Sequence, residues 1–439
     1  MDVTRIQVEY AYSHRIGAEP EFTGGNTIDL GLFDARGSAF PAAGFRGWSG
    51  SERDTIWISE TEATPGYLAG PLIPGQWHVL LGLYKIAPEG CAYRVAITIT
   101  TAPARAQGGN NAALLSPVGR LPATPPAAPF WPWLRGELHC HTWHSDGASS
   151  PGELVQLAYD RGLDFLAVTD HNTTSSQSEL ATLSEPGLVL LRGMEVTTFK
   201  GHFNVWGIGD WIDFRVESPE QMEHAIRAAS EHGGLTSCNH PKPNGPPWEY
   251  PEVTGCDCVE VWNGPWTHLN ELSLNFWLEQ LGRGMRKPAI GGSDYHRASE
   301  PAQGMRRAPG TPTTWVHVTG TPSEQAVLAA IRRGHVTLSA GPEGPLLELV
   351  AGDDSEAQGG DAMPCPVGGN LAVQVRCRGG SGNELRLLDQ NGTLHTQSLV
   401  AQDQALDLTL PLHSSLYLRA ELRDTNGKVT ALTNPIYFR

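Results

Sequence analysis

The chain is poor in cysteine and has no apolar run long enough to cross a membrane. Seven cysteines are scattered over 439 residues and form no CxxC pair, so a disulfide framework is not expected and a reducing compartment fits better. A membrane helix needs about 18 apolar residues, and no such run occurs. The first residues, MDVTRIQVEYAYSHR, lack the apolar core of a signal peptide. We therefore expect a cytoplasmic protein without a membrane partner.

Positive charge is also scarce. Lys and Arg number 31 against 47 Asp and Glu, which gives a net charge of −16. This balance argues against nucleic acid or an anionic membrane as the main partner. It does not exclude a small anionic substrate, because bound divalent ions can make one pocket positive inside an acidic protein.

What the chain has in abundance is Gly (50) and Pro (33), as expected for many turns and short strands, and its length suggests two or three domains. Residues 1–104 contain segments that alternate apolar and polar residues between glycine-rich turns, which predicts an N-terminal β-sandwich. Residues 105–133 are rich in Gly, Ala and Pro and are interpreted as a linker. Residues 345–439 return to short alternating segments and predict a second β-sandwich.

Between these flanks, residues 134–344 alternate short apolar strands with helical segments. We expect helices at 151–161, 219–232, 268–281 and 322–333, with about seven strands between and around them. Ser150 and Glu153 have the spacing of a capping box at the first helix. The alternation predicts an α/β fold with a mostly parallel sheet or barrel.

The ends of these strands carry most of the histidines. His139 and His141 flank Cys140 in an expected strand, ELHCHT, so both imidazoles should point to one side and Cys140 to the other. The other candidate ligands follow or begin other apolar segments: Asp146, His171, Glu195, His202, His240, Asp294 and His296. Chemistry in parallel α/β folds gathers at the carboxyl ends of the strands, so these side chains should converge. Metal coordination would compensate their desolvation, which predicts a multinuclear metal site.

These segments together resemble a known family. ELHCHTWHSDG, AVTDHN, GMEVT with GHFNVWG, CNHP and GGSDYH are similar to the successive motifs of the PHP (polymerase and histidinol phosphatase) metallohydrolases, and the likeness covers about residues 135–345. The N-terminal GFRGWSGS, ATPGYLAGPLIPGQWHV and YKIAPEGCAY also resemble the CehA/McbA-like subgroup. The resemblance implies a distorted seven-stranded β/α barrel, TIM-like in outline, that holds two or three divalent metal ions.

Carried onto this chain, the resemblance assigns three metal positions. His139, His141, Glu195 and Asp294 would hold the first metal. Glu195 would bridge to a second, completed by His240 and His202. Asp146, His171 and His296 would hold the third. Many relatives have His where this chain has Asp146. The aspartate makes the third position richer in oxygen.

A metal-dependent hydrolase is the function that this set of ligands favours. Mixed His and carboxylate ligands suit Zn²⁺, Mn²⁺ or Fe²⁺, and a bound metal makes hydroxide available at neutral pH. We expect hydrolysis of a small-molecule phosphate ester, with Lys242 and Arg297 as candidate catalytic residues that hold phosphate oxygens. Two alternatives stay open: a carbamate, ester or amide hydrolase with the same metals, and a carbohydrate- or partner-binding protein with a structural metal centre. The sequence does not indicate an oligomeric state.

Overall fold

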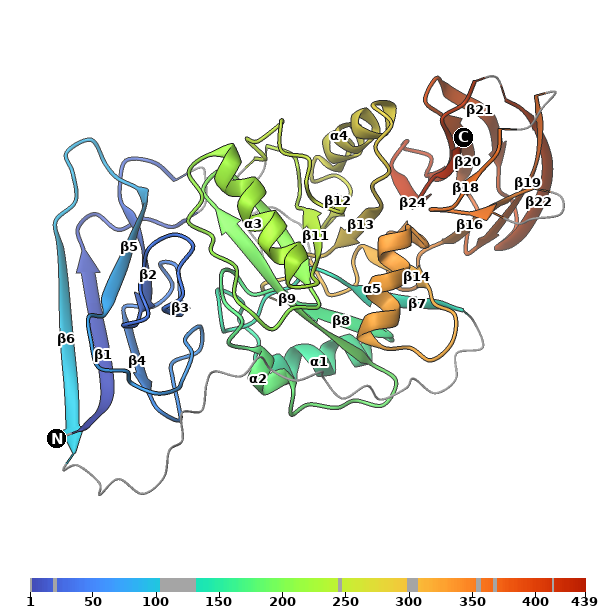
Figure 1. The fold of residues 1–439 in the computed structure, drawn as a ribbon. Helices are drawn as coiled ribbons and strands as arrows, with labels where there is room; N and C mark the ends of the chain where they lie inside the picture. Colours follow the sequence, from blue (N-terminus) through green and yellow to red (C-terminus); the bar gives the residue numbers. More distant parts are fainter. Residues whose placement is uncertain are drawn as a thin grey trace.

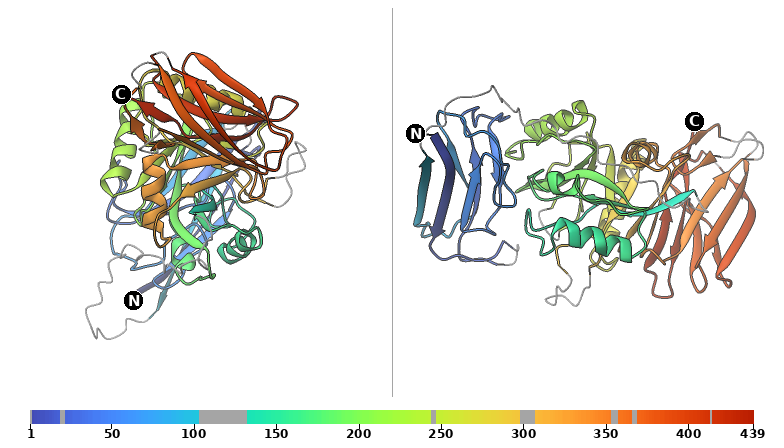
Figure 2. Two further views of the ribbon diagram at one scale, coloured as in Figure 1. Left: turned by 90° about the vertical axis from the view of Figure 1, so that its right-hand side faces the viewer. Right: turned by 90° about the horizontal axis from the view of Figure 1, so that it is seen from below.

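The computed structural model describes residues 2–18, 22–102, 132–243, 247–297, 307–352, 357–365, 369–412 and 414–439. The chain has a mixed α/β fold with a large mixed sheet and few helices. Its N-terminal strands, its central α/β part and its C-terminal strands follow one another along the molecule (Figures 1 and 2). The linker expected at 105–133 lies outside the described residues, apart from its last two positions.

Six strands make up the N-terminal part: β1 (Asp2–Tyr12), β2 (Thr27–Phe33), β3 (Phe45–Trp48), β4 (Thr55–Ser59), β5 (His78–Lys85) and β6 (Tyr93–Ala102). They form two three-stranded sheets, in the orders β4-β1-β6 and β3-β2-β5. Alternate apolar residues such as Val8, Leu30 and Ile58 enclose a core between these sheets. The β3-β2-β5 sheet lies on the side of the central part (Figure 1).

The central part begins with seven strands: β7 (Trp133–Glu137), β8 (Phe165–Val168), β9 (Val189–Thr198), β10 (Gly201–Trp206), β11 (Leu235–Cys238), β12 (Cys258–Asn263) and β13 (Ala289–Gly292). They lie side by side in chain order. Four of the six pairings in this row are parallel, as expected of a mostly parallel sheet, and the exception is β10, which is antiparallel to both β9 and β11. Thr198 pairs with Gly201 across a hairpin of two residues, and so short a connection permits only antiparallel pairing.

The row of seven strands curls until its two ends meet. Beyond β7 and β13, the amide of Asp294 donates to the carbonyl of His139 at 2.7 Å, and the amide of His141 donates to the carbonyl of Tyr295 at 2.9 Å. These bonds bring the chain that follows the first strand of the row next to the chain that follows the last. The segments at residues 139–141 and 294–296 are thereby joined.

The sheet does not stop at these seven strands. It continues from β7 through β14 (Thr313–His317) and β15 (Val336–Ser339) into C-terminal strands, and comprises fifteen strands within the described residues. The seven-stranded barrel is therefore not confirmed as a separate unit. The boundary expected at residue 345 is also crossed, because β15 pairs with β24 through Thr337 and Thr433.

The C-terminal strands are β16 (Leu346–Ala351), β17 (Ala357–Gln358), β18 (Ala362–Met363), β19 (Asn370–Arg378), β20 (Glu384–Asp389), β21 (Gly392–Ser398), β22 (Asp403–Pro411), β23 (Tyr417–Arg423), β24 (Val429–Thr433) and β25 (Ile436–Phe438). One sheet has the order β17-β16-β19-β22, while β24, β23, β20 and β21 extend the central sheet. Leu347, Val373, Leu385 and Leu422 belong to the core that these strands share.

The helices are α1 (Pro151–Asp160), α2 (Gln177–Leu180), α3 (Pro219–Glu231), α4 (Asn270–Gly282) and α5 (Glu324–Arg333). The capping box of Ser150 and Glu153 is confirmed. Helix α5 begins two residues later than expected, because the Ser323 side chain accepts the amide of Ala326 and so caps the first turn. In the part of the chain that the structure describes, no helix is long and apolar enough to cross a membrane.

Candidate metal centre

The sequence had suggested that His139 and His141 lie within a strand. In the structure their segment lies just beyond β7. Strand β7 ends at Glu137, and the next residues bond to the segment after β13. Cys140 nevertheless points away from its two neighbours, since its side chain is buried in a core with Leu154 and Leu166. The two imidazoles are left on the opposite side, with ring centroids 5.1 Å apart.

All nine residues predicted as ligands come together in space. We call them the metal cluster: His139, His141, Asp146, His171, Glu195, His202, His240, Asp294 and His296. They form four overlapping groups, in each of which one possible ligand atom per residue lies within 4.8 Å of the others. The groups are His141, Asp146, His171 and His296; His139, His240 and Asp294; His139, His141 and Glu195; and Glu195, His202 and His240.

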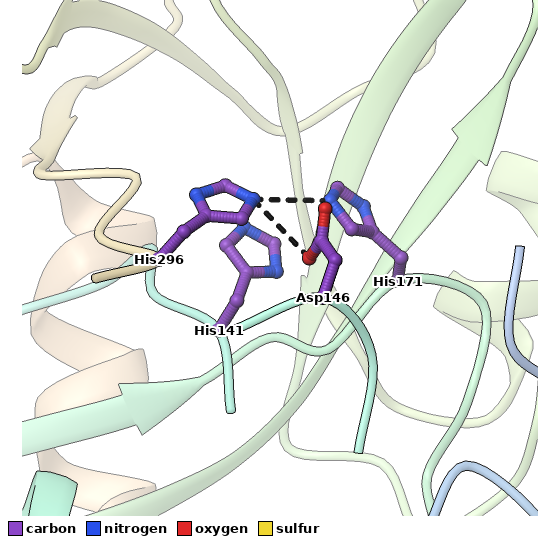
Figure 3. A group of neighbouring side chains, drawn as sticks. All are labelled: His141, Asp146, His171 and His296. Atoms are coloured by element: carbon purple, nitrogen blue, oxygen red, sulfur yellow. Dashed lines mark hydrogen bonds and ion pairs between the residues drawn. The ribbon is translucent and has the colours of Figure 1, made fainter. Parts of the chain in front are cut away.

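Asp146 lies between two imidazoles at the more open end of the cluster. Its Oδ1 is 3.3 Å from Nε2 of His296 and 3.5 Å from Nε2 of His171. Figure 3 shows these three side chains converging with His141 from separate segments of chain. Asp146 is 31% exposed, whereas His139 and His141 are fully buried. This end of the cluster is therefore the one that solvent reaches.

Glu195 occupies the middle of the cluster. Its Oε1 is 3.2 Å from both Nε2 of His139 and Nδ1 of His202, and 3.5 Å from Nε2 of His240. Its Oε2 is 2.7 Å from Nδ1 of His171. One carboxylate thus faces four imidazoles from four segments, as a ligand shared between two metals must.

Several buried ring nitrogens of the cluster lack a hydrogen-bond partner, and this observation indicates whether the cluster suits metals. Nδ1 of His141, Nε2 of His202 and Nδ1 of His240 have no hydrogen-bond partner among the described residues. Buried polar atoms are normally paired, because an unpaired one costs about 1–3 kcal/mol. Imidazole nitrogens and carboxylate oxygens are both common ligands of divalent transition metals. The residues present therefore fit a centre of two or more divalent metals.

The charges within the cluster keep its carboxylates ionised. Burial would raise the pKa of Glu195, but the imidazoles of His139, His202 and His171 hold it well below its usual range. Burial likewise opposes ionisation of Asp294, and Arg307 leads the charges that lower its pKa. For His141, burial together with His296 and His171 lowers the pKa to about 3. Ionised carboxylates and a neutral imidazole are the forms that bind metals.

Two residues of the cluster have strained backbones. His240 has a φ of 27° and Asp294 a φ of 52°, a region that residues other than glycine rarely adopt. Such conformations persist only where surrounding contacts hold the backbone in place, and they are most frequent at functional sites. At His240 the backbone amide donates to Oε2 of Glu260 at 2.9 Å, which helps hold this conformation.

Glu260 contacts the metal cluster but was not among the residues predicted from the sequence. Its Oε1 lies 2.8 Å from Nδ1 of His139, while Oε2 also accepts from the side-chain amide of Asn263 at 3.1 Å. A carboxylate on the second ring nitrogen fixes the orientation of a ligand histidine. Gly292 leaves room for this contact, because a Cβ there would lie 2.3 Å from Cβ of His139. A charged residue inside the apolar strand CVEVWN was the signal available in the sequence.

Arg307 and Glu137 also support the cluster from outside it. Nη1 of Arg307 lies 2.8 Å from Oδ2 of Asp294. Glu137 accepts the backbone amides of His139, Ser293 and Gly310 at 2.8, 2.9 and 2.6 Å. These contacts fix the two segments that carry His139 and Asp294. No local pattern in the sequence predicts these contacts.

We expect Glu260→Gln to weaken metal binding by about 10- to 100-fold, the usual cost of changing a residue that orients a ligand. The amide has the same shape but cannot offer His139 a charged acceptor. Metal affinity measured by competition with a chromogenic chelator tests this, with Glu252→Gln at an exposed position as the matched control. Equal affinity of the Glu260 variant and the control would remove Glu260 from the site.

The two predicted phosphate-binding residues lie in different surroundings. Lys242 is 3% exposed, and its Nζ donates to the carbonyl of Asn263 at 3.1 Å and to Oδ1 of Asn270 at 2.8 Å. Burial lowers its pKa to about 7. Arg297 is exposed, and its guanidinium donates to the carbonyl of Asp146 at 3.3 Å. The roles of Lys242 and Arg297 stay predictions, and the contacts of Lys242 favour a supporting role.

His144, for which the sequence suggested no ligand role, joins the N-terminal part to the cluster. Its Nδ1 lies 2.8 Å from Oγ of Ser175. The amide of Gly66, from the N-terminal part, donates to the same Oγ at 3.1 Å, and Thr173 donates to the carbonyl of Gly66 at 3.0 Å. A Cβ at Gly66 would lie 2.8 Å from the carbonyl oxygen of His144. The N-terminal part is therefore seated on the loops that carry Asp146 and His171.

Part of the chain matches a known protein family. Residues 137–241 match the model of the PHP domain. The chain is 44% identical over 64 residues to a 5'-3' exoribonuclease of Haemophilus influenzae, a match that covers 14% of this chain and 23% of that protein. It is 30% identical over 126 residues to a 3',5'-nucleoside bisphosphate phosphatase of Chromobacterium violaceum, covering 24% and 44%. The matches thus span less than half the length of either relative.

A solved structure with a similar arrangement is a two-domain protein of Bacteroides vulgatus that contains a predicted PHP-like metal-dependent phosphoesterase. The similarity covers 69% of this chain and 95% of that one, with 17% identity and a TM-score of 0.36. A likeness of this size carries no argument about function.

Proposed function

We propose that this chain, which carries a PHP domain over residues 137–241, is a metal-dependent hydrolase that acts on phosphate esters of small molecules. The observation that carries the proposal is the metal cluster: nine His, Asp and Glu side chains in four overlapping groups, with partnerless buried nitrogens among them. A structural metal site usually closes with four ligands around one ion, whereas this set exceeds that need.

The residues of the cluster would hold two or three divalent metals. His139, His141, Glu195 and Asp294 fit one position, and Glu195 with His202 and His240 fits a second. Asp146, His171 and His296 fit a third, at the more exposed end. Zinc, manganese or iron suits these donors, and such metals supply hydroxide at neutral pH and stabilise charge on phosphoryl oxygens. Glu260 orients His139, and Arg307 orients Asp294.

Charge favours a phosphate over a neutral substrate. Three divalent ions would bring a charge of about +6 against the carboxylates of Asp146, Glu195 and Asp294, which leaves the pocket positive. Arg297, next to the exposed end, adds a further positive charge. A phosphate dianion suits this field, whereas an uncharged carbamate gains less from it.

The overall charge favours a small substrate over a nucleic acid. Two of the named relatives act on nucleotides or RNA by their names, but the net charge of −16 opposes a long polyanion. A small phosphate ester needs only the local positive field at the cluster.

The proposal is tested by metal analysis followed by a substrate screen. The purified protein should contain two or more divalent ions per chain, and should release phosphate from a generic aryl phosphomonoester in the presence of Mn²⁺ or Zn²⁺. Aryl phosphodiester and aryl carbamate substrates are assayed in parallel. Faster carbamate than phosphate turnover would favour the other hydrolase class. No turnover of any class despite bound metals would contradict the proposed function.

A further inference from the structure

Asp29 lies on the face of the N-terminal part that looks toward the metal cluster. It belongs to β2, where Leu30 and Leu32 point into the N-terminal core. Because side chains alternate along a strand, Asp29 and Phe33 point the other way. Phe33 packs on Trp211 of the central part, with ring centroids 6.2 Å apart. Asp29 therefore projects from the same sheet face, toward the central part.

The carboxylate of Asp29 is buried and has no partner. Its residue is 8% exposed, and no hydrogen bond or ion pair joins its side chain to any residue that the structure describes. It lies across Gly82 of the neighbouring strand, where an added Cβ would be 3.3 Å from Oδ2. Burial raises its pKa to about 7, and the positive charge of His171 opposes this rise. Burial of this kind opposes ionisation of the carboxyl, and a hydrogen-bond donor beside it would offset that effect.

The position of Asp29 relative to the cluster is fixed by several contacts. Gly66 is bonded to Thr173 and Ser175, close after His171 in the chain. The indole of Trp211 donates to the carbonyl of Asn172 at 3.0 Å and stacks on Phe45 with centroids 4.0 Å apart. The loop that carries His171 is thus held against the sheet that carries Asp29.

Aromatic side chains border the same region. Tyr84, two residues after Gly82 on β5, packs on Phe199 with ring centroids 5.1 Å apart. Phe199 lies in the hairpin between β9 and β10, close after Glu195 in the chain, and is 50% exposed. An aromatic pair and an unpaired carboxylate therefore lie on the same face of the β3-β2-β5 sheet.

We propose that Asp29 determines specificity by accepting a hydrogen bond from a hydroxyl or ammonium group on the leaving group of the phosphate ester. This inference rests on the proposed function, since it places the phosphate at the metal cluster and the rest of the substrate against the N-terminal sheet. The hydroxyl and ammonium groups have in common that each donates a hydrogen bond. A donor that reaches Asp29 satisfies a carboxylate that otherwise lacks a partner, and an apolar group at the same place leaves it unsatisfied.

The test uses alkyl phosphates of graded length that end in methyl, hydroxyl or amino groups. The full-length wild-type protein should hydrolyse the best donor-ended ester with a kcat/KM about 10- to 100-fold above that of its methyl-ended counterpart, as expected for a charge-assisted hydrogen bond. The hydroxyl and amino series identify which donor is used. In Asp29→Leu the ratio should fall toward one, and Asp29→Asn should lie between. Asp54→Asn, an exposed aspartate of the same part, is the control and should keep the wild-type ratio.

Thermal unfolding separates recognition from a structural role. Asp29→Asn should melt at or above the wild-type temperature, because it removes a buried carboxyl without a partner. Hydrolysis of all esters without donor preference, unchanged in Asp29→Leu, would overturn the role of Asp29 and leave the proposed function intact. A lowered melting temperature of Asp29→Asn with an unchanged ratio would also overturn it. No hydrolysis of any ester would contradict both.

Discussion

Replacing Glu195 by glutamine should lower metal-dependent turnover by more than about 100-fold. That figure is the upper cost of changing a residue that only orients a ligand, and Glu195 lies at the centre of the cluster itself. Its two oxygens face His139, His202 and His240 on one side and His171 on the other. The amide keeps the shape and the hydrogen bond from Asn239, but has neither the charge nor the second oxygen to share between metals.

The measurement is kcat/KM for an aryl phosphate together with metal content per chain. Glu195→Gln should bind at least one metal fewer than the wild type, and added Mn²⁺ or Zn²⁺ should not restore full activity. Glu252→Gln, at an exposed position, should match the wild type in both readouts. A Glu195 variant that retains all metals and turns over at the wild-type rate would show that the cluster does not depend on this carboxylate.

Stripping the metals should destabilise the central part by about 4 kcal/mol, relative to protein at a free-metal concentration of about 1,000 times Kd. Metal binding stabilises the folded chain because the complete set of ligands exists only there. The buried tryptophans Trp206, Trp262 and Trp277 lie in the core of the central part, so their fluorescence reports its unfolding.

The comparison is made by thermal unfolding with and without a chelator, followed by re-addition of Mn²⁺ or Zn²⁺. The wild type should lose stability with the chelator and regain it with metal. The His139→Ala/Asp294→Ala double variant should respond to neither. A wild-type melting curve that is unaffected by chelation, in protein shown to have lost its metals, would contradict a metal centre that is integral to the fold.

The metal cluster was predictable from the sequence because each ligand follows a local pattern. His171 and His240 come shortly after the short apolar strands β8 and β11, and Glu195 lies in the second half of β9; the curled sheet brings these positions together. The supporting residues were not predictable in this way. Arg307 reaches Asp294 from the segment before β14, and Glu260 reaches His139 from a different strand. Such contacts depend on tertiary packing, and the residues that make them have no characteristic spacing in the sequence.

The sheet itself departed from expectation for a similar reason. Strand-helix alternation predicted a mostly parallel sheet, and the exception, β10, follows a hairpin at Thr198 and Gly201 that reverses the chain within two residues. The pairing of β15 with β24 joins residues almost a hundred positions apart, so the C-terminal strands extend the central sheet. The position of Asp29 opposite His171 likewise follows from the docking of two parts of the chain.

The most direct test of the central claim is phosphate release by the metal-loaded wild type and by the His139→Ala/Asp294→Ala double variant, under matched conditions. We expect metal-dependent release by the wild type and a loss of more than about 100-fold in the variant, since two residues of the cluster are removed. Both proteins should share the same circular dichroism spectrum. Equal phosphate release by the folded double variant would contradict the assignment of the hydrolytic site to this cluster.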